Sequence, residues 1–377
     1  MLEMPLGPNP IRINPAVMLK PPAPLALASI MRHLSVPSKQ TAHWRQYLAS
    51  QGWLASGFGI HNLDSMRAIP LNDSAPNKID IFTIVDLEAI KAGPKHWTDR
   101  LDKQLYDLHP ELWPQSHDQI GDIIILKIPE KLNPYRGAIG QAILEQHSNV
   151  RAVCADEGVQ GEFRIRKLDV IASGDGSIST QTRVREHGNQ FYVNPQTAYY
   201  SPRLATERLN TLQVAIDLKA YLGRPIDICD PYAGVGPGLV PLANSTGLCN
   251  SITAADINPG AVELLKQNLP GHWAECRDAR ELSNEKPECA DLLLVNLPHE
   301  SIEHLPHLIP LLKTNSKSII RAWAILDQSI LGEIELKLRE ILSKEEIISL
   351  KLTATKSYSP SDAYTCIEIH LMRQSHQ

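Results

Sequence analysis

The chain has 377 residues, of which 43% are hydrophobic and 21% are charged, and its formal net charge is −5. This length predicts two or three domains at about 100–200 residues per domain, and the composition is typical of a soluble globular protein. The negative charge argues against a generic polyanion binder. It leaves room for a local basic face that binds RNA, because phosphate contacts are screened over about 10 Å.

The sequence indicates neither a membrane span nor a secretory leader. No stretch approaches the ~20 apolar residues of a membrane helix. Residues 1–20 are rich in proline and lack the continuous apolar segment of a signal peptide. The six cysteines show no C-x-x-C spacing. We therefore expect a cytoplasmic protein with free thiols, no disulfide framework and no metal site.

The first part of the chain predicts a tail followed by a small module. Residues 1–35 carry many prolines and little periodicity, which predicts a poorly ordered tail. A helix is expected over residues 41–48 and a short strand over residues 66–71, giving a small α+β module at 36–76. A strand at residues 78–85 is expected to begin the next domain.

Residues 78–195 predict a mixed α+β middle domain. A buried strand at 121–128 precedes a helix at 133–147, and further strands follow, ending in a hairpin that turns across residues 186–188. A helix over residues 204–222 then leads into alternating strands and helices. This alternation predicts a doubly wound α/β domain at 196–377.

Three segments of that α/β domain share one pattern, a buried strand running into a polar or glycine-containing loop. They are residues 227–237, 254–259 and 293–298. Ligands of open α/β sheets bind outside such strand ends, and glycine lets the backbone approach them closely. Asp256 ends the second strand of the unit, where an acid binds a ribose diol. The pattern indicates a nucleoside-type cofactor, with S-adenosyl-L-methionine the leading candidate.

The glycine loop alone is weak evidence for that cofactor. Only two glycines have the dinucleotide spacing, and the Lys-Ser/Thr pair of a phosphate-binding loop is absent. A cofactor without phosphate needs neither feature. The alternative is a tight strand-to-helix turn with no cofactor.

Together with segments of the same order and spacing, these residues resemble the archaeal and eukaryotic type of tRNA (guanine-37-N1)-methyltransferase over about residues 36–377. The Asn-Leu-Pro triplet at 296–298 is fairly specific, since the related wybutosine-pathway aminocarboxypropyl transferases usually differ there and in the glycine loop. Gly238, the Arg-Ala-Trp-Ala run at 321–324 and the N-terminal tail depart from the pattern. The resemblance rests on residues 36–37, 121–129, 161–164, 200–208, 230–237, 256–259, 278–280, 296–298 and 356–360.

The resemblance implies a class I methyltransferase domain with a Rossmann-like doubly wound sheet, an α+β middle domain, and a small N-terminal module that touches the outer corner of tRNA. The enzyme would be a monomer that transfers a methyl group from S-adenosyl-L-methionine to N1 of the guanine 3′ of the anticodon. Two other hypotheses remain: an aminocarboxypropyl transferase that uses the same cofactor, and a catalytically inactive RNA-binding protein.

The resemblance also implies roles for individual residues. Glu207 would be the general base that removes the N1 proton, and Arg164 would stabilise charge on O6. Asn296 and Pro298 would lie beside the target base, on which Tyr199 and Tyr200 would stack once it is flipped out. The alternatives are a surface Glu207 paired with Arg203 or Arg208, a middle-domain salt bridge for Arg164, a loop cap for Asn296 and core positions for the tyrosines.

For the cofactor, Asp256 is expected to accept from the ribose and Asp278 from the adenine amine, or each to cap a helix. The remaining cofactor residues would be Arg203, Asp230, Tyr232, Gly234, Gly236, Ile257, Ala279 and Asn296. A weaker prediction assigns tRNA phosphates to basic residues of the middle domain, namely Lys127, Lys131, Arg136, Arg166, Lys167, Arg183 and Arg185.

Overall fold

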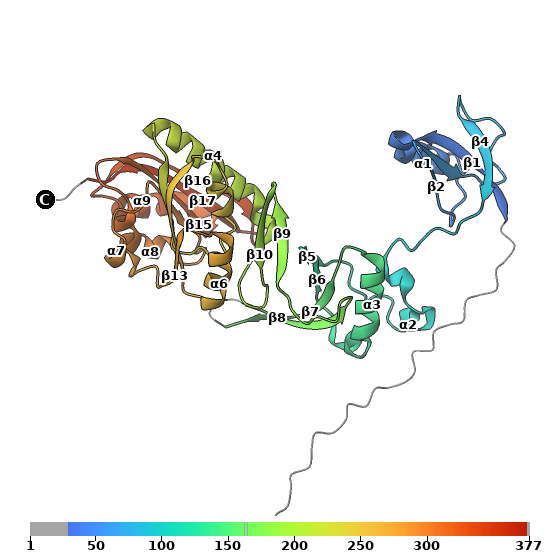
Figure 1. The fold of residues 1–377 in the computed structure, drawn as a ribbon, viewed down its shortest axis with the longest axis horizontal. Coiled ribbons are helices and arrows are strands. Elements are labelled where there is room, and N and C mark those ends of the chain that lie inside the picture. Colours follow the sequence, from blue (N-terminus) through green and yellow to red (C-terminus); the bar gives the residue numbers. More distant parts are fainter. Residues whose placement is uncertain (1–28, 162, 164, 375–377) are drawn as a thin grey trace, which may run out of the picture. The chain divides into compact units, whose positions relative to one another are not determined.

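The computed structural model describes residues 29–161, 163 and 165–374. The chain divides into two folded units, Met1–Lys95 and His96–Gln377 (Figure 1). No helix in the described residues is both long enough and apolar enough to cross a membrane.

The first unit is an antiparallel sheet in the order β2-β3-β1-β4 that carries one α-helix. Leu34 and Val36 alternate along β1 and pack with Leu48 of α1 and Ile69 of β3, as the period of two along a strand requires. The elements are β1 (Ile30–Pro37), η1 (Ser38–Gln40), α1 (Thr41–Ser50), β2 (His61–Leu63), β3 (Met66–Pro70) and β4 (Thr83–Glu88).

This unit differs from the predicted boundaries in two ways. Strand β1 begins at Ile30, inside the segment predicted to be a tail. Strand β4, predicted to open the middle domain, instead pairs with β1, where Ile30 lies opposite Glu88. Both differences arise because β1 has two edges, and β3 pairs with only one of them. The rest of the predicted tail, residues 1–28, lies outside the described residues.

The second unit begins with the middle sheet, in the order β5-β6-β7-β8. Helix α3 packs against β7 and β8, and its Ile139 and Ile143 share a core with Trp97 and Trp113. The elements are η2 (Trp97–Arg100), α2 (Lys103–Leu108), β5 (Asp118–Ile120), β6 (Ile123–Leu126), η3 (Glu130–Tyr135), α3 (Arg136–Gln146), β7 (Ala152–Gln160) and β8 (Ile165–Ser173).

The predicted hairpin is present as β9 (Thr182–Glu186) and β10 (Asn189–Val193). The sequence predicts it as part of the middle domain, but it packs on the α/β part of the second unit: β10 contacts α5 (Val240–Ala243) and α6 (Pro259–Asn268) (Figure 1). Phe191 and Val193 enter the same core as Ile228 of that part. The reason is the alternation along both strands, which gives the hairpin one apolar face that the α/β part buries.

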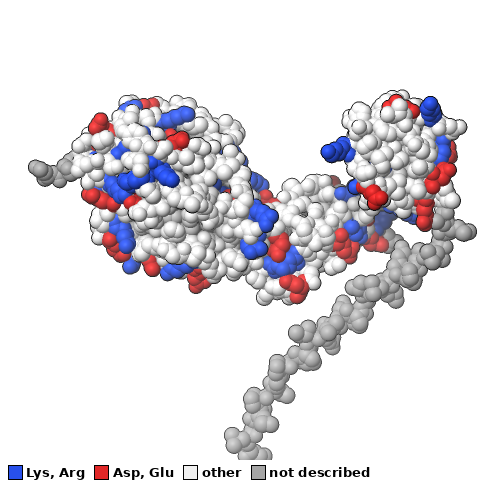
Figure 2. Space-filling model, turned by 45° about the horizontal axis from the view of Figure 1, so that its top comes forward, with Lys and Arg blue, Asp and Glu red and all other residues white. Residues whose placement is uncertain are grey.

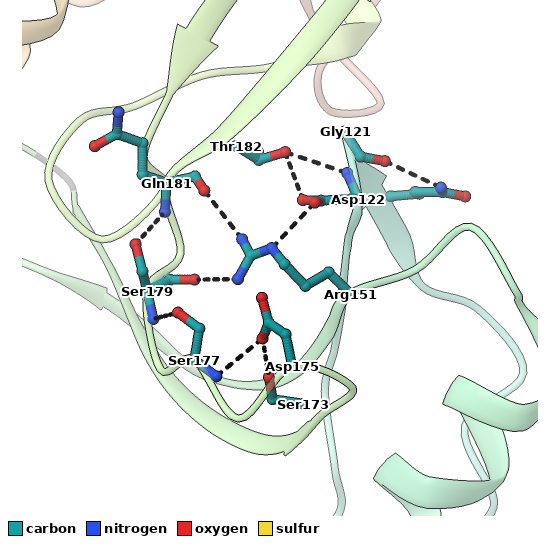
Figure 3. Close-up of polar contacts among 10 residues, drawn as sticks. Gly121, Asp122, Arg151, Ser173, Asp175, Ser177, Ser179, Gln181 and Thr182 are labelled. Atoms are coloured by element: carbon teal, nitrogen blue, oxygen red, sulfur yellow. Dashed lines mark hydrogen bonds and ion pairs between the residues drawn. The ribbon is translucent and has the colours of Figure 1, made fainter.

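An arginine holds the link between the middle sheet and this hairpin (Figure 3). Arg151 donates from Nε to Oδ2 of Asp122 (3.0 Å) and from its two terminal nitrogens to the carbonyls of Ser179 and Gln181 (3.0 Å each). Thr182 donates to the other oxygen of Asp122, 2.7 Å away. Arg151 therefore satisfies two backbone carbonyls of the link and fixes its conformation where the hairpin begins.

The α/β part of the second unit holds a 7-stranded sheet in the order β13-β12-β11-β14-β15-β17-β16. Strands β11 to β15 run parallel, whereas β17 is antiparallel to both β15 and β16. The strands are β11 (Ile226–Asp230), β12 (Cys249–Asp256), β13 (Trp273–Cys276), β14 (Leu292–Val295), β15 (Lys317–Asp327), β16 (Glu346–Ser357) and β17 (Asp362–Met372).

The helices and short 3-10 turns of this part precede β11 or connect the strands that follow it. They are η4 (Pro202–Leu204), α4 (Ala205–Leu222), α5 (Val240–Ala243), α6 (Pro259–Asn268), α7 (Leu282–Glu285), α8 (Ser301–Leu308), η5 (Ile309–Leu311), η6 (Gln328–Ile330) and α9 (Leu331–Ile341). The predicted doubly wound sheet is confirmed. Because β11 has β12 on one side and β14 on the other, the strand order reverses at β11, which is where such sheets bind ligands.

Candidate active site

A pocket opens at the carboxyl ends of β11 and β14, at this reversal point. It brings together four of the predicted site residues, Glu207, Asp230, Tyr232 and Asn296, from segments far apart in the chain. The residues that line it are Leu204, Glu207, Arg208, Thr211, Asp230, Tyr232, Ala233, Pro237, Gly238, Leu294, Asn296, Trp323 and Tyr364. The strand ends thus meet the first turn of α4 at one place.

The carboxylate of Asp230, which lines the pocket, interacts with that of Asp256 at the end of β12. Burial raises the pKa of Asp230 to about 7; the Tyr232 amide opposes the shift, and the charge of Asp256 adds to it. Burial also raises the pKa of Asp256, against the amides of Asn258 and Gly234. No Lys, Arg or His contributes to either shift. The described residues therefore leave this acidic pair without a positive partner.

The glycine loop is shaped around Asp256. The amide of Gly234 donates to its Oδ2 over 2.7 Å, and that of Asn258 to its Oδ1 over 2.9 Å. Gly234 has φ +55°, and a Cβ there would meet open space, so the loop leaves room beside it. Gly236 has φ +83°, and a Cβ would lie 2.8 Å from Cδ1 of Leu265. A side chain is thus disfavoured at both positions by the backbone, and at Gly236 also by packing.

The other predicted cofactor residues flank the acidic pair. The Tyr232 hydroxyl lies 2.7 Å from Nδ1 of His304, and burial raises the pKa of that tyrosine. Asp278 is held by Arg280, whose side-chain bond lowers the pKa of the carboxyl to about 2. Ala279 is buried beside Asp278, and Ile257 is 49% exposed. Asp278 is therefore a charged acceptor, unlike Asp230.

On the opposite side, Glu207 lies in the first turn of α4, where the helix dipole favours a negative charge. Its Oε1 accepts from Asn210 over 2.9 Å. Its Oε2 lies 3.4 Å from Nε1 of Trp323 and 3.5 Å from Nη2 of Arg321. Arg208, a predicted alternative partner, instead forms a buried fork with Glu186 over 2.6 Å. Glu207 thus reaches the pocket as a half-buried carboxylate in contact with Arg321 and Trp323 of β15.

Asn296 follows β14 directly and faces the same pocket. Its Oδ1 accepts from the Tyr364 hydroxyl over 2.8 Å, and burial raises the pKa of that tyrosine. The carbonyl of Pro298 accepts from the amide of Ile325 over 2.9 Å, which ties the Asn-Leu-Pro loop to β15. Asn296 therefore keeps its amide nitrogen for another acceptor. The loop has a fixed place beside Glu207.

Three predicted site residues lie elsewhere in the described structure, or outside it. Tyr200 is 5% exposed, donates to Glu186 and packs on Phe191 and Arg208, so it is a core residue with no face for a base. Arg203 does not line the pocket; its Nη2 donates to Asp118 of the middle sheet over 2.9 Å, its side chain is 64% exposed, and its role toward the cofactor stays a prediction. Arg164 lies outside the described residues. Tyr199 is 58% exposed, which a stacking ring requires.

Sequence reasoning missed Trp323 and Tyr364, which line the pocket, and Arg321, which lies behind Glu207. Arg321 and Trp323 belong to the run that departs from the family pattern, which was the one available signal. Tyr364 carried no signal, because its place opposite Ile325 depends on the pairing of β15 with β17. Gly238 also departs from that pattern; it lines the pocket and leaves open space where a larger residue would stand.

Comparison with known proteins places these residues in a family. Residues 182–350 match the TRM5/TYW2 methyltransferase domain, and residues 98–177 match the TYW2 N-terminal domain. A curated relative from Pyrococcus abyssi, the tRNA (guanine(37)-N(1))-methyltransferase Trm5b, is 32% identical over 285 residues, which are 73% of this chain and 79% of that protein. The chain belongs to the TRM5/TYW2 methyltransferase family.

Other members of the TRM5/TYW2 family extend the comparison. The tRNA (guanine(37)-N(1))-methyltransferase 1 of Vitis vinifera is 26% identical over 66% of this chain and 41% of that longer protein. The crystal structure of P. abyssi Trm5b aligns with a TM-score of 0.62 at 27% identity, covering 91% of this chain and 99% of that one. A complex of aTrm5 with tRNALeu aligns with a TM-score of 0.63 at 24% identity and supports the fold. The class I methyltransferase fold is thereby confirmed.

Proposed function

We propose that this protein transfers a methyl group from S-adenosylmethionine to N1 of guanine 37 in tRNA. The observation that carries the proposal is that Glu207 and Asn296 meet at the reversal point of the sheet, beside the acidic pair Asp230 and Asp256. The relatives from P. abyssi and V. vinifera are named for this reaction, and the P. abyssi protein aligns over most of both chains.

The chemistry of the acidic pair fits this cofactor. S-adenosylmethionine carries a sulfonium, an amino group and a ribose diol, which together offer the positive charge and the donors that Asp230 and Asp256 lack. The open space at Gly234 leaves room for a ligand against the backbone. We assign Asp256 to the ribose, Asp278 and the adjoining Ala279 and Ile257 to the adenine, and Asp230, Tyr232, Gly234 and Gly236 to the methionine side.

The bound cofactor supplies an electrophilic methyl group, and the protein must remove the N1 proton and accommodate charge on O6. Glu207 accepts the proton, because it is a carboxylate that lines the pocket. Among the described residues its Oε1 accepts one hydrogen bond, from Asn210, and can still accept the N1 proton. The Asn296 amide, oriented by Tyr364, holds the base, with Pro298 beside it. We assign Arg164 to O6 and the exposed ring of Tyr199 to stacking on the flipped guanine.

We propose that the outer face of the β9–β10 hairpin binds the anticodon loop. Arg183 and Arg185 alternate with buried residues and line a hollow of about 770 Å³ with His187. Tyr192 lies opposite Arg183 across the hairpin and is 39% exposed. An exposed ring beside arginines is a typical surface for single-stranded RNA. Elsewhere, on the face shown in Figure 2, Lys and Arg are interspersed with Asp and Glu.

The remaining proposals concern the whole protein. We assign the first unit, through Lys95, to the outer corner of the tRNA, and we expect the enzyme to act as a monomer. The six cysteines are free thiols. Free thiols persist in a reducing compartment, so we place the reaction in the cytoplasm.

An aminocarboxypropyl transferase is the second candidate, because residues 98–177 match a TYW2 N-terminal domain. Nucleoside mass spectrometry separates the two. Unmodified tRNA with guanine 37, and the same tRNA with adenine 37, are incubated with enzyme and S-adenosylmethionine. One methylguanosine from the first tRNA alone, lost in Glu207→Ala, is the expected result. A heavier amino-acid adduct supports the second candidate, and no product refutes both.

A further inference from the structure

The side chain of Arg321 is among the most buried charged groups of this domain and lies directly behind Glu207. We propose that Arg321, balanced by Glu368, is a positioning residue that sets the orientation and basicity of Glu207 during proton removal. The inference rests on the proposed function. It deepens that function by assigning to β15 a role that the residue pattern of the family did not suggest.

The geometry comes from the register of two strands. Arg321 lies directly opposite Glu368 in the β15–β17 pairing, and the two side chains form an ion pair. Trp323 is two residues along β15, so it shares a sheet face with Arg321, whose guanidinium lies 5.6 Å from its ring centre. Both side chains reach the same oxygen of Glu207. Two side chains on one face of the sheet thus contact the Glu207 carboxylate.

The burial of Arg321 shows that it acts through Glu207. Its side chain is 5% exposed and does not line the pocket, whereas that of Glu207 is 14% exposed and does. Its Nε has no hydrogen-bond partner among the described residues. A buried arginine with an unsatisfied nitrogen is costly to the fold. The contact with the carboxylate of Glu207 offsets part of this cost.

Charge balance explains why Arg321 does not disable the base. A lone guanidinium beside Glu207 would oppose uptake of a proton. Glu368 neutralises Arg321, and His370 lies 3.0 Å from the second oxygen of Glu368. The hydrogen bond from His370 lowers the pKa of Glu368, so Glu368 stays charged. The contact of Arg321 to Glu207 is looser, at 3.5 Å. The Arg321–Glu368 pair therefore orients the Glu207 carboxylate and adds little net positive charge beside it.

Other titratable groups also face Glu207, and their positions stay the same in the test below. They come from the same helix and from β17. They are Arg208, which is paired with Glu186, and Tyr364 and Cys366; Tyr199 interacts with Tyr364.

The test is the pH dependence of the single-turnover rate of methyl transfer at saturating enzyme. Removing the cation in Arg321→Gln should raise the apparent pKa of the base. The ascending limb of the pH–rate profile should therefore move by about one pH unit to higher pH. Removing its counter-charge in Glu368→Gln should move the limb by a similar amount to lower pH. Arg321→Lys keeps the charge without the fork and should hold the limb position while slowing the plateau by about tenfold. KM for tRNA should not change.

A matched control is Arg224→Gln, which removes another arginine–carboxylate pair, with Asp291, at the other end of the strands. Arg224→Gln should lower the midpoint of thermal unfolding and leave the ascending limb of the pH–rate profile unchanged. Unshifted limbs in Arg321→Gln and Glu368→Gln, with rates reduced only in proportion to folded protein, would overturn the role. If Arg321→Gln does not fold, Glu368→Gln and Arg321→Lys decide. Wild-type enzyme without product overturns the proposed function and this role together, whereas active wild-type with unshifted variants overturns the role alone.

Discussion

Replacing Asp230 by Asn should stabilise the protein and weaken its cofactor binding at the same time. Burial raises the pKa of Asp230 from 3.8 to about 7, so the folded protein binds its proton more tightly than the unfolded chain does. The full stability is present below about pH 4 and is lost as the pH rises to 7. Three pKa units correspond to about 4 kcal/mol of destabilisation above pH 7. Asparagine has the same shape, can keep the bond from the Tyr232 amide and carries no charge.

The assay is urea unfolding of wild type and Asp230→Asn between pH 4 and pH 8.5. The variant should match wild type at pH 4 and exceed it increasingly up to pH 7, by up to about 4 kcal/mol. Asp227 on the same strand is the matched control, because Lys313 and other partners outweigh its burial and lower its pKa. Asp227→Asn should therefore lose stability at pH 8, the opposite sign.

Cofactor binding supplies the second half of this prediction. A cationic cofactor favours the ionised carboxylate, so wild-type affinity for S-adenosylmethionine should fall as the pH drops below about 7. Asp230→Asn should bind on the order of tenfold more weakly at pH 8, since a charged hydrogen bond contributes about 1.5–3 kcal/mol, and should lose the pH dependence. Calorimetric titration measures both. Parallel stability curves, or unchanged affinity at pH 8, would refute the reasoning.

Three further predictions concern the base, the loop beside it and the link to the hairpin. Glu207→Gln should slow single-turnover methyl transfer by about 10²–10⁴-fold while cofactor affinity stays within error, and an unchanged rate would remove Glu207 as the base. Tyr364→Phe loses the bond to Asn296 and should lower kcat/KM by about 3- to 10-fold; no loss would mean that Asn296 is held without it. Gly121→Ala should destabilise by more than about 2 kcal/mol, because its Cβ would lie 2.2 Å from Thr182 Oγ1 at φ +57°. Gly137→Ala, in α3 with open space around it, should instead be neutral or stabilising in the same unfolding assay, and equal losses would contradict the argument.

The TRM5/TYW2 match is compatible with two reactions, methyl transfer and aminocarboxypropyl transfer. The two reactions make different demands on the residues and the space of the pocket. Methylation of a ring nitrogen needs a base beside the target atom, and Glu207 is the residue that we propose for that role. The same pocket would have to accommodate a much larger transferred group in the other reaction. The product mass therefore tests the pocket as well as the family assignment.

The sequence by itself determined the strand-end residues of the site. Asp230, Asp256 and Asn296 each end a buried parallel strand, and parallel strands bring their carboxyl ends to one edge. The doubly wound fold and the hairpin were predictable for the same reason, because both follow from local periodicity and turn residues. These features depend on interactions close in the chain.

Only the tertiary structure decided what surrounds Glu207. Its partner Arg321 lies on β15, and the charge that balances Arg321 comes from β17, so both depend on strand register rather than on local pattern. The same holds for the burial of Tyr200 against Glu186 and for the pairing of β4 with β1. The free energy of such contacts comes from packing distant segments against each other. Local sequence names the residues that can make them but does not determine which of them meet.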